Sequence, residues 1–366
     1  MEEAGLQATV DALGNMRGRR DGREDLAPVM IGSHLDTVPE GGHFDGVAGL
    51  LAALEVVRAL NDRKTVTRRP LEIVNFSAEE SSRFGVATLG SKAMTGKLAE
   101  EDLDSVADSQ GRSLRQVLLG AGLNPDNLKE ARLRPGDVHA FLELHIEQGP
   151  ILEDADCPLG IVTAIAAPTR FRVFVAGRAD HSGTTPMGMR RDALAGASEL
   201  VLGVERIAAR EPGGGTVATV GWLRVAPGVM NVVPAGAELG IDIRDIDQGR
   251  KQRTAEKIVR LMKMIAERRS LEIRYETMAD DTPTRLPGRI VDILEKAAGE
   301  LHIACRQVAS GAGHDAMNMA AITEAGLIFV PSIGGISHNV AEKSRMEDIC
   351  RGAEVLLKSA LILGEE

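Results

Sequence analysis

Aromatic residues are scarce in this chain of 366 residues, and there is no excess of positive charge. It contains one Trp, one Tyr and seven Phe, and its 53 acidic residues outnumber its 43 Lys and Arg residues, which gives a formal net charge of -10. Proteins that bind nucleic acid need basic patches for the phosphates and aromatic rings on which bases can stack. The sequence offers neither, so we expect no nucleic-acid partner and a small molecule in its place.

Cysteines, long apolar runs and secretory features are scarce as well. Cys157, Cys305 and Cys350 are odd in number and far apart, so they match neither a zinc ribbon nor a disulfide framework and suit a reducing compartment. No apolar stretch is long enough to span a bilayer. The acidic start, MEEA, lacks the positive region and apolar block of a secretory signal. We therefore expect a cytoplasmic protein with no membrane partner.

The first part of the chain alternates strand and helix patterns. Apolar runs at 27–36, 71–78 and 141–149 predict buried strands, and 46–60 predicts an apolar helix. Residues 97–134 carry helical patterning with polar breaks. Such alternation is typical of an α/β layer structure with a mostly parallel sheet.

A different order of predicted strands and helices follows, and after it the first order returns. The pattern β-α-β-β-α-β of a ferredoxin-like sandwich is predicted for strands at 170–178, 216–225, 237–246 and 271–279 with helices at 192–210 and 250–269. After Pro283 the alternation resumes through a strand at 327–332 to a helix at 347–362. We therefore expect two domains. One is a catalytic α/β domain in two pieces, 1–168 and 283–366, with a mixed, mostly parallel sheet and flanking helices. The other is an inserted ferredoxin-like α+β domain at 169–282 that serves for dimerisation or as a lid.

The segment GSHLDTVPEGGHFDGVAG (32–49) holds the first candidate site residues. His34 and Asp36 are two residues apart at a strand end, so their side chains share one side. This suits a metal-binding imidazole with a carboxylate behind it. Asp45 lies in a glycine-rich turn before a helix, where one carboxylate can reach two cations. A surface polar pair is the alternative for a lone His-x-Asp, but the full pattern makes it a poor explanation.

Two adjacent acids follow the strand at 71–78. Successive side chains of an extended chain diverge, so one acid can bind metal while the other faces the substrate water. We assign Glu80 to metal and Glu79 to general base and acid. A solvated acidic pair is the alternative, and it fits poorly at the end of a buried strand.

A polar face also marks the strand ELHIEQG. Glu143, His145 and Glu147 share one parity, and Leu144 and Ile146 share the other. Ionisable groups in an apolar context need partners. A metal at His145 would supply one, although a lone core histidine is more often only hydrogen-bonded.

The last candidate ligand is His338, in the glycine-rich GGISHNVAE that follows the strand at 327–332. Ligands of such folds bind near the carboxyl ends of the strands. Charge counting supports a two-metal site, because Asp45, Glu80 and a bridging hydroxide leave +1 against two divalent ions. That charge can polarise a carbonyl and attract a carboxylate. Oxygen and nitrogen ligands without thiolate fit Zn²⁺, with Mn²⁺ or Co²⁺ possible.

These motifs also carry a family resemblance over nearly the whole chain. In order, GSHLDT, GGHFDGVAG, AEESSRFG, ATLGSKAMTG, ELHIEQGP, HSGTTPM, NVVPA, SGAGHDA and GISHN resemble the amidase/hydantoinase/carbamoylase branch of the zinc aminoacylase and peptidase superfamily. The resemblance implies that Asp45 bridges two metals. Glu80 and His338 would complete one site, and His34 and His145 the other.

The resemblance implies further roles outside the metal ligands. His181, in ADHSGTTPM, corresponds to a histidine that crosses to the partner subunit's site and stabilises the oxyanion. Asn231 and Arg244 match residues that bind the substrate carboxylate, and Gln148 matches a substrate contact. Gly335 is expected to bind substrate too.

Some residues in these motifs keep two interpretations. The planar fork of Arg244 matches a carboxylate, but Arg244 lies between Asp242 and Asp245 and could form a structural ion pair. His314 and Asp315, in GAGHDA, are expected next to the site without a defined role.

The sequence as a whole predicts a dimetal amidohydrolase that cleaves the ureido C–N bond of a small carboxylate and acts as a homodimer through its inserted domain. An N-carbamoyl-L-amino acid is the first substrate expected, releasing ammonia, CO2 and the amino acid, and allantoate is the second. A dipeptidase or aminoacylase with the same metals is an alternative enzyme. A non-catalytic metal-dependent binding module is the alternative outside enzymes.

Overall fold

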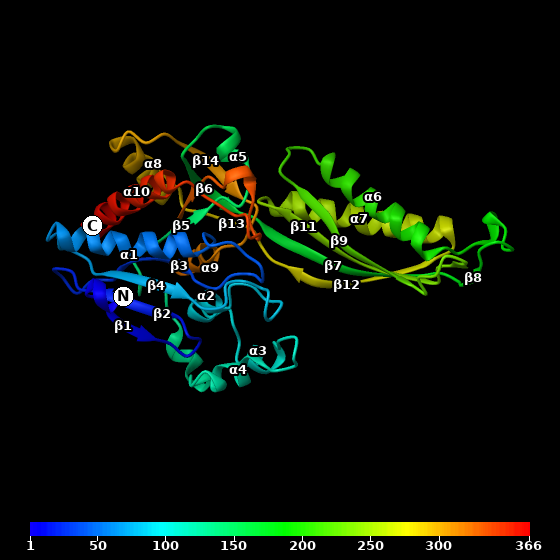
Figure 1. The fold of residues 1–366 in the computed structure, drawn as a ribbon, viewed down its shortest axis with the longest axis horizontal. Coiled ribbons are helices and arrows are strands. Elements are labelled where there is room, and N and C mark those ends of the chain that lie inside the picture. The colour runs from blue at the N-terminus through cyan, green and yellow to red at the C-terminus, as the bar shows by residue number, and fades with distance from the viewer. The chain divides into compact units, whose positions relative to one another are not determined.

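The computed structural model describes all 366 residues, which form two compact units. The larger unit comprises Met1–Ile165 and Arg285–Glu366, and the inserted unit comprises Ala166–Thr284. Figure 1 shows the elements of both units along the chain. We expected the inserted segment at 169–282.

The larger unit is built on a mixed nine-stranded sheet. Its order is β1 (Gln7–Val10), β2 (Met16–Arg20), β4 (Leu71–Phe76), β3 (Val29–His34), β5 (Ala140–Ile146), β15 (Glu324–Val330), β6 (Leu159–Ile165) and β13 (Thr284–Arg285), and β14 (Cys305–Ser310) pairs with β6. The central strands β4, β3, β5 and β15 are parallel. Antiparallel pairs lie on both sides of them, β1 with β2 and β2 with β4 on one and β6 with β15 on the other. The α/β class with a mostly parallel sheet is confirmed.

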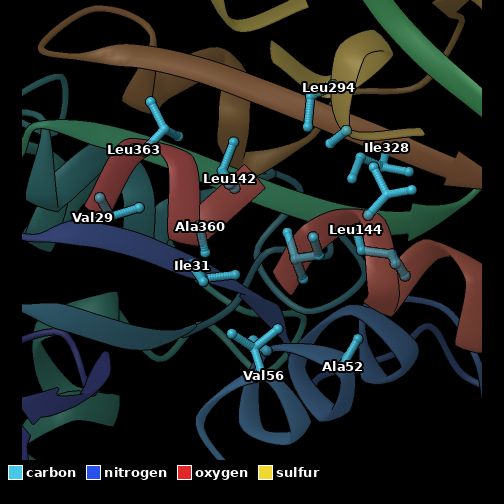
Figure 2. Packing of buried hydrophobic residues seen from close by; sticks show 14 of the residues in the cluster. Val29, Ile31, Ala52, Val56, Leu142, Leu144, Leu294, Ile328, Ala360 and Leu363 are labelled. Atoms are coloured by element: carbon cyan, nitrogen blue, oxygen red, sulfur yellow. The ribbon is translucent and has the colours of Figure 1, made fainter. Parts of the chain in front are cut away.

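Both faces of this sheet are covered, which explains why its central strands are continuous apolar runs. One face carries α1 (Val47–Asp62), α8 (Gly288–Glu300) and α10 (Met346–Gly364). Figure 2 shows this cluster, in which Ile31 and Leu144 of the sheet pack near Val56 and Ala360 of the helices. Full burial of one such aliphatic side chain contributes about 1.5–3 kcal/mol.

The opposite face of the sheet carries short helices. Phe141 and Phe329 of the sheet pack there with Met94 of α2 (Leu89–Met94) and Met319 of α9 (Asp315–Met319). The expected helical stretch at 97–134 is broken into α3 (Asp102–Ser105), α4 (Leu114–Gly120) and the 3-10 turn η2 (Pro125–Ala131). The other short turns of this unit are η1 (Glu2–Ala4), α5 (Ile151–Asp154) and η4 (Ile333–Gly335).

The inserted unit has the strand order of a ferredoxin-like sandwich. Its four-stranded antiparallel sheet runs β12 (Glu272–Asp280), β7 (Ala167–Ala176), β11 (Gly236–Asp245) and β9 (Val217–Ala226). Helices α6 (Ala193–Ala209) and α7 (Gln248–Arg269) cover one face, where alternate residues of β7 and β11 are buried. A two-stranded ribbon, β8 (Asp180–His181) with β10 (Val232–Val233), and the turn η3 (Met187–Met189) complete the unit.

Local sequence explains where these two helices begin. Asp192 precedes α6 and accepts a hydrogen bond from the Ala195 N–H at 2.9 Å, and Asp247 caps α7 in the same way through the Arg250 N–H at 2.8 Å. Such caps satisfy N–H groups that have no partner inside the helix. None of the helices of the protein combines the length and apolar character needed to cross a bilayer.

Candidate metal centre and active site

The candidate site lies where the parallel strands of the larger unit end. His34 is the last residue of β3, and His145 is the last but one of β5. Glu79 and Glu80 follow β4, and His338 lies in the loop after β15. Because the carboxyl ends of parallel strands meet at one edge, the fold brings these distant segments together.

A first group of donor atoms comes from His34, Asp45 and His145. His145 Nε2 lies 3.1 Å from Asp45 Oδ1, His34 Nε2 lies 3.5 Å from the same oxygen, and the two Nε2 atoms are 3.5 Å apart. Two ligands about 2.1 Å from a tetrahedral zinc ion lie about 3.4 Å apart. The three donor atoms therefore have the spacing that a bound cation requires.

The opposite nitrogens of both rings fix their orientation. His34 Nδ1 lies 2.9 Å from the Asp36 carbonyl oxygen, and His145 Nδ1 lies 2.9 Å from the Ile146 carbonyl oxygen. A carbonyl oxygen only accepts, so each Nδ1 carries the proton, and a neutral ring presents its Nε2 lone pair. Lone pairs that converge on each other and on a carboxylate need a positive charge among them. Burial opposes a charged ring at both histidines, yet the Asp45 carboxylate raises the pKa of both.

A glycine gives the first imidazole its place. Gly46 has φ 64°, and a Cβ built on it would lie 2.5 Å from ring atoms of His34. Any other residue would meet both the strain of the left-handed region and the histidine ring. The glycine in GGHFDG thus lets the turn that carries Asp45 pass closely over His34.

A second group of donor atoms comes from Asp45, Glu80 and His338, so the two groups share Asp45. His338 Nε2 lies 3.4 Å from Asp45 Oδ2 and 3.3 Å from Glu80 Oε1. Glu80 Oε1 is buried and has no hydrogen-bond donor, as an oxygen kept for a cation would be. The nearby carboxylates of Asp45 and Glu80 raise the pKa of His338 to about 10, so this group of donor atoms favours a positive charge.

Glu79 lies next to the first group as a buried acid. Its Oε2 is 3.9 Å from His34 Nε2, and only 8% of the residue is exposed. Burial raises the pKa of Glu79 to about 7, with a further rise from Glu80 that His34 opposes. A carboxyl with a pKa near neutrality is suited to both accept and return a proton.

Asp36 differs from its expected role as a carboxylate behind His34. Its carboxylate oxygen is 3.8 Å from His34 Nδ1, and the carbonyl oxygen of Asp36 occupies the closer position. The carboxylate instead accepts hydrogen bonds from the backbone N–H groups of Glu79 at 3.1 Å and Glu80 at 3.0 Å. Asp36 therefore joins the end of β3 to the loop that carries both acids.

Gln148 and Gly335 lie in the same part of the larger unit. Gln148 Nε2 donates a hydrogen bond of 2.7 Å to Asp45 Oδ2, and Gln148 Oε1 is buried without a partner. Gly335 has φ 65°, and a Cβ there would lie 2.9 Å from Pro150 N, so this loop also packs closely on the segment after β5.

Three further ionisable residues, Glu143, His314 and Asp315, are buried close to the first group of donor atoms. Glu143 accepts hydrogen bonds from Ser33 Oγ and the Ala316 N–H, both at 3.0 Å. His314 stacks edge-on against His145 with ring centroids 4.5 Å apart, and burial holds its pKa well below the usual value. Burial raises the pKa of Asp315 well above its usual value, and its Oδ1 accepts a 2.5 Å hydrogen bond from Ser91. Glu147 instead accepts from two backbone N–H groups at the start of α5.

The remaining predicted residues belong to the inserted unit, and two of them lie together. His181 pairs with Val232, and the Ser182 N–H donates to the Asn231 carbonyl oxygen at 3.1 Å. The Gly183 N–H donates to His181 Nδ1 at 3.0 Å, so the exposed Nε2 of a neutral ring carries the proton.

Arg244 is far from this pair within the unit. It faces Pro168 in the pairing of β11 with β7, whereas the His181 ribbon lies beyond the opposite end, where Gly236 pairs with Ala176. Eight residues separate Arg244 from Gly236, which corresponds to about 26 Å of extended strand. Arg244 also forms the ion pair that was its alternative role, with Nε 2.9 Å from Asp242 Oδ1.

Glu342 is a residue next to the site that the sequence motifs do not point to. It is 2% exposed and accepts hydrogen bonds from both the Asp45 loop and the His338 loop. The only signal in the sequence is an acid that closes the GGISHNVAE segment.

Two donor groups that share one carboxylate, with a buried acid beside them at the edge of an α/β sheet, are typical of two-metal hydrolases. Comparison with known proteins gives the family. The sequence pattern of peptidase family M20/M25/M40 matches residues 30–361. The chain therefore belongs to this family.

Individual relatives are similar over almost the whole chain. The N-carbamoyl-L-amino-acid amidohydrolase of Pseudomonas sp. (strain NS671) is 40% identical, covering 99% of this chain and 88% of that protein. The ureidoglycolate hydrolase of Arabidopsis thaliana is 39% identical, covering 97% and 76%. The crystal structure of an amidase of the hydantoinase/carbamoylase family from Burkholderia multivorans matches with a TM-score of 0.91 at 37% identity, covering 100% of this chain and 88% of that one. The expected enzyme class, a hydrolase of carbamoyl or ureido C–N bonds, is confirmed by these relatives.

Proposed function

We propose that this chain is a dimetal amidohydrolase that cleaves the ureido C–N bond of an N-carbamoyl-L-amino acid and releases ammonia, CO2 and the amino acid. One observation carries the proposal. Two groups of cation-ligating atoms share Asp45, and Glu79, with a pKa of about 7, lies beside them. Allantoate and ureidoglycolate also carry a ureido group and a carboxylate, so the same chemistry applies to them.

His34, Asp45 and His145 would hold one divalent ion, and Asp45, Glu80 and His338 the other. Five nitrogen and oxygen ligands without thiolate favour Zn²⁺, with Mn²⁺ and Co²⁺ as alternatives. When bound, such a pair lowers the pKa of water and polarises a carbonyl. The chain's own contribution is to hold these ligands and to exclude bulk water from the buried imidazoles.

Glu79 is the proposed general base and acid. It accepts a proton as water adds to the ureido carbon and returns that proton to the leaving nitrogen. Since burial keeps its pKa near 7, the carboxyl can hold the proton between the two steps without a large energetic penalty. Gln148 and Gly335 are the proposed substrate contacts of the larger unit.

His181, Asn231 and Arg244 are the proposed substrate-binding residues of the inserted unit. The proton on His181 Nε2 suits a donor to the developing oxyanion. However, about 26 Å of strand separates the His181 end of the sheet from Arg244, so one small substrate cannot reach both in one chain. This separation supports a site in which His181 and Asn231 come from the partner subunit of a homodimer.

A dimer through the inserted unit also accounts for its exposed apolar residues. The strand β9 is an edge strand, and Val217 and Leu223 on it are exposed, as is Leu202 on α6. Edge strands with exposed apolar side chains are ready to pair with another chain. We include cytoplasmic location in the proposal, because the three cysteines are free thiols.

The decisive experiment is to measure the release of ammonia and of free amino acid from a panel of substrates with Zn²⁺, Mn²⁺ and Co²⁺. The panel contains N-carbamoyl-L-amino acids, allantoate, ureidoglycolate and a dipeptide. We expect the highest kcat/KM with an N-carbamoyl-L-amino acid. Cleavage of the dipeptide alone, which yields no ammonia, would instead identify a peptidase. Tight binding of ureido compounds without turnover in metal-loaded protein would identify a binding module.

A second experiment tests the exchange of His181 between subunits. Mixed dimers of a His181→Ala chain and a Glu79→Gln chain should regain up to about a quarter to a half of wild-type activity, because one of their two sites is intact. Homodimers of either variant are the controls. Verified mixed dimers without any recovery would show that each site is built from one chain.

A further inference from the structure

Glu342 joins two loops that lie almost three hundred residues apart in the sequence. Its Oε1 accepts hydrogen bonds from the backbone N–H groups of Phe44 and Asp45, both at 3.1 Å. Its Oε2 accepts from Ser337 Oγ at 2.8 Å and from the His338 N–H at 3.3 Å. All four donors belong to the segments that carry Asp45 and His338, and no cation of the chain pairs with the carboxylate.

We propose that Glu342 is a positioning residue that sets the distance between Asp45 and His338, and thereby the affinity of the ion that these two residues hold with Glu80. This inference rests on the proposed function, because the proposed function places a metal ion at the second donor group. Glu342 itself reaches neither cation nor substrate in this account.

The backbone of His338 explains why such a residue is needed. His338 has φ 54°, in the left-handed region that a histidine adopts only at a cost, and its side chain is 50% exposed. A strained and exposed loop residue keeps one orientation only if its surroundings fix it. The hydrogen bonds from Ser337 and His338 to Glu342 supply that restraint.

The chain makes room for the carboxylate at one further position. A Cβ built on Gly42 would lie 2.3 Å from Glu342 Oε1 and 2.4 Å from its Cβ. Only glycine at this position lets Glu342 reach the Asp45 turn. The turn that carries Asp45 and the Glu342 carboxylate therefore pack closely without a bound ligand.

The two ions should depend on Glu342 to different degrees. His34 and His145 are on buried strands and are each fixed by a second hydrogen bond to a backbone carbonyl. Their ion depends on Glu342 only through Asp45. Glu342→Gln should therefore weaken the ion of the second group by about 10–100-fold, the usual effect of losing a residue that orients a ligand, and leave the other ion nearly unchanged.

The test measures metal affinity directly, by competition with a chelator under buffered Zn²⁺ and by metal content after dialysis. Wild type should bind two ions per chain, and Glu342→Gln should retain one at zinc levels that saturate wild type. Glu354→Gln, an exposed acid on α10, is the matched control and should retain two. Ser337→Ala removes the hydroxyl that donates to Glu342 at 2.8 Å and lies 3.3 Å from Asp45 Oδ2, should fold readily, and should weaken the same ion to a smaller extent.

The outcomes separate the inference from the proposed function. A wild-type chain that binds no metal pair contradicts the proposed function itself. The role of Glu342 alone is contradicted if wild type binds two ions but Glu342→Gln and Ser337→Ala bind both as tightly as wild type does. The same holds if these variants weaken both ions equally. As a final check, adding Glu342→Gln to a His338→Ala chain should weaken the remaining ion only slightly, since Glu342 reaches that ion only through Asp45.

Discussion

The two donor groups of this site are built in different ways. In the first, His34 and His145 come from neighbouring parallel strands, are almost fully buried, and have rings fixed by backbone carbonyls. In the second, His338 comes from a loop, is half exposed, and is oriented through Glu342. Ligands on regular elements are held more precisely than ligands on loops. If each group binds an ion, as we propose, the sheet itself defines the first site, whereas contacts between loops define the second.

Loss of the ligand that both groups share should have the largest effect. Asp45→Asn removes a negative charge that both groups share. Burial would raise the pKa of the Asp45 carboxyl, but the imidazoles of His145, His338 and His34 lower that pKa far below its usual value. We expect the chain to lose both ions and turnover to fall by more than about 10⁴-fold, beyond the contribution of a single acid–base residue. Asp62→Asn, at an exposed position of α1, is the matched control.

Metal content by mass spectrometry and ammonia release would be measured on the same samples. If Asp45→Asn kept one tightly bound ion, the first group would not need the shared carboxylate, and the two sites would be more independent than the geometry indicates.

Glu79→Gln should separate the metal sites from the chemistry. The change keeps the shape of a residue that ligates neither ion in our proposal, so both ions should remain bound. Turnover should fall by about 10²–10⁴-fold, because the proton of water then has no acceptor of suitable pKa. Single-turnover rates with metal-loaded protein would measure this. Near-normal turnover would exclude Glu79 as the base.

Much of the fold could be predicted because its central strands are distinctive. The strands β3, β4 and β5 are buried apolar runs, and each was expected within a few residues of its observed bounds. The strands β1 and β2 were not expected, since β1 is fully exposed and β2 reads MRGRR. The arginines of β2 join the sheet through partners such as Glu72, which Arg17 meets at 2.6 Å. Such a strand depends on its neighbours, and its own sequence carries no apolar alternation.

The residues of the candidate site also divide into those that the sequence predicts and those that it does not. Candidate ligands in short motifs, such as His34 and Glu80, could be selected from the sequence because metal ligands are restricted to few residue types, and the fold brings both into groups of donor atoms that could hold a cation. Asp36 and Glu342 act on backbone N–H groups of distant loops, which any sequence supplies. Such contacts leave no recognisable pattern of residue types in the sequence. The sequence therefore predicts Asp36 as a partner of the His34 ring, and it does not predict the contacts of Glu342.

The smallest predicted effect concerns the order in which the two ions leave the unaltered protein. If strands define the first site and loops the second, a chelator should remove the ion of the second group first. We expect two separate steps, with dissociation constants at least about tenfold apart, the lower end of what ligand-orienting contacts contribute.

Titration with a chelator, followed by both metal content and ammonia release, would resolve these steps. His338→Ala should remove the weaker step and leave the stronger one in place, which assigns each step to its group. Release of both ions in a single step would mean that Asp45 couples the groups so tightly that the difference between strand and loop ligands has no thermodynamic consequence. In that case the buried histidines would contribute no more to holding metal than the exposed one, and the contrast between the two groups would be one of location only.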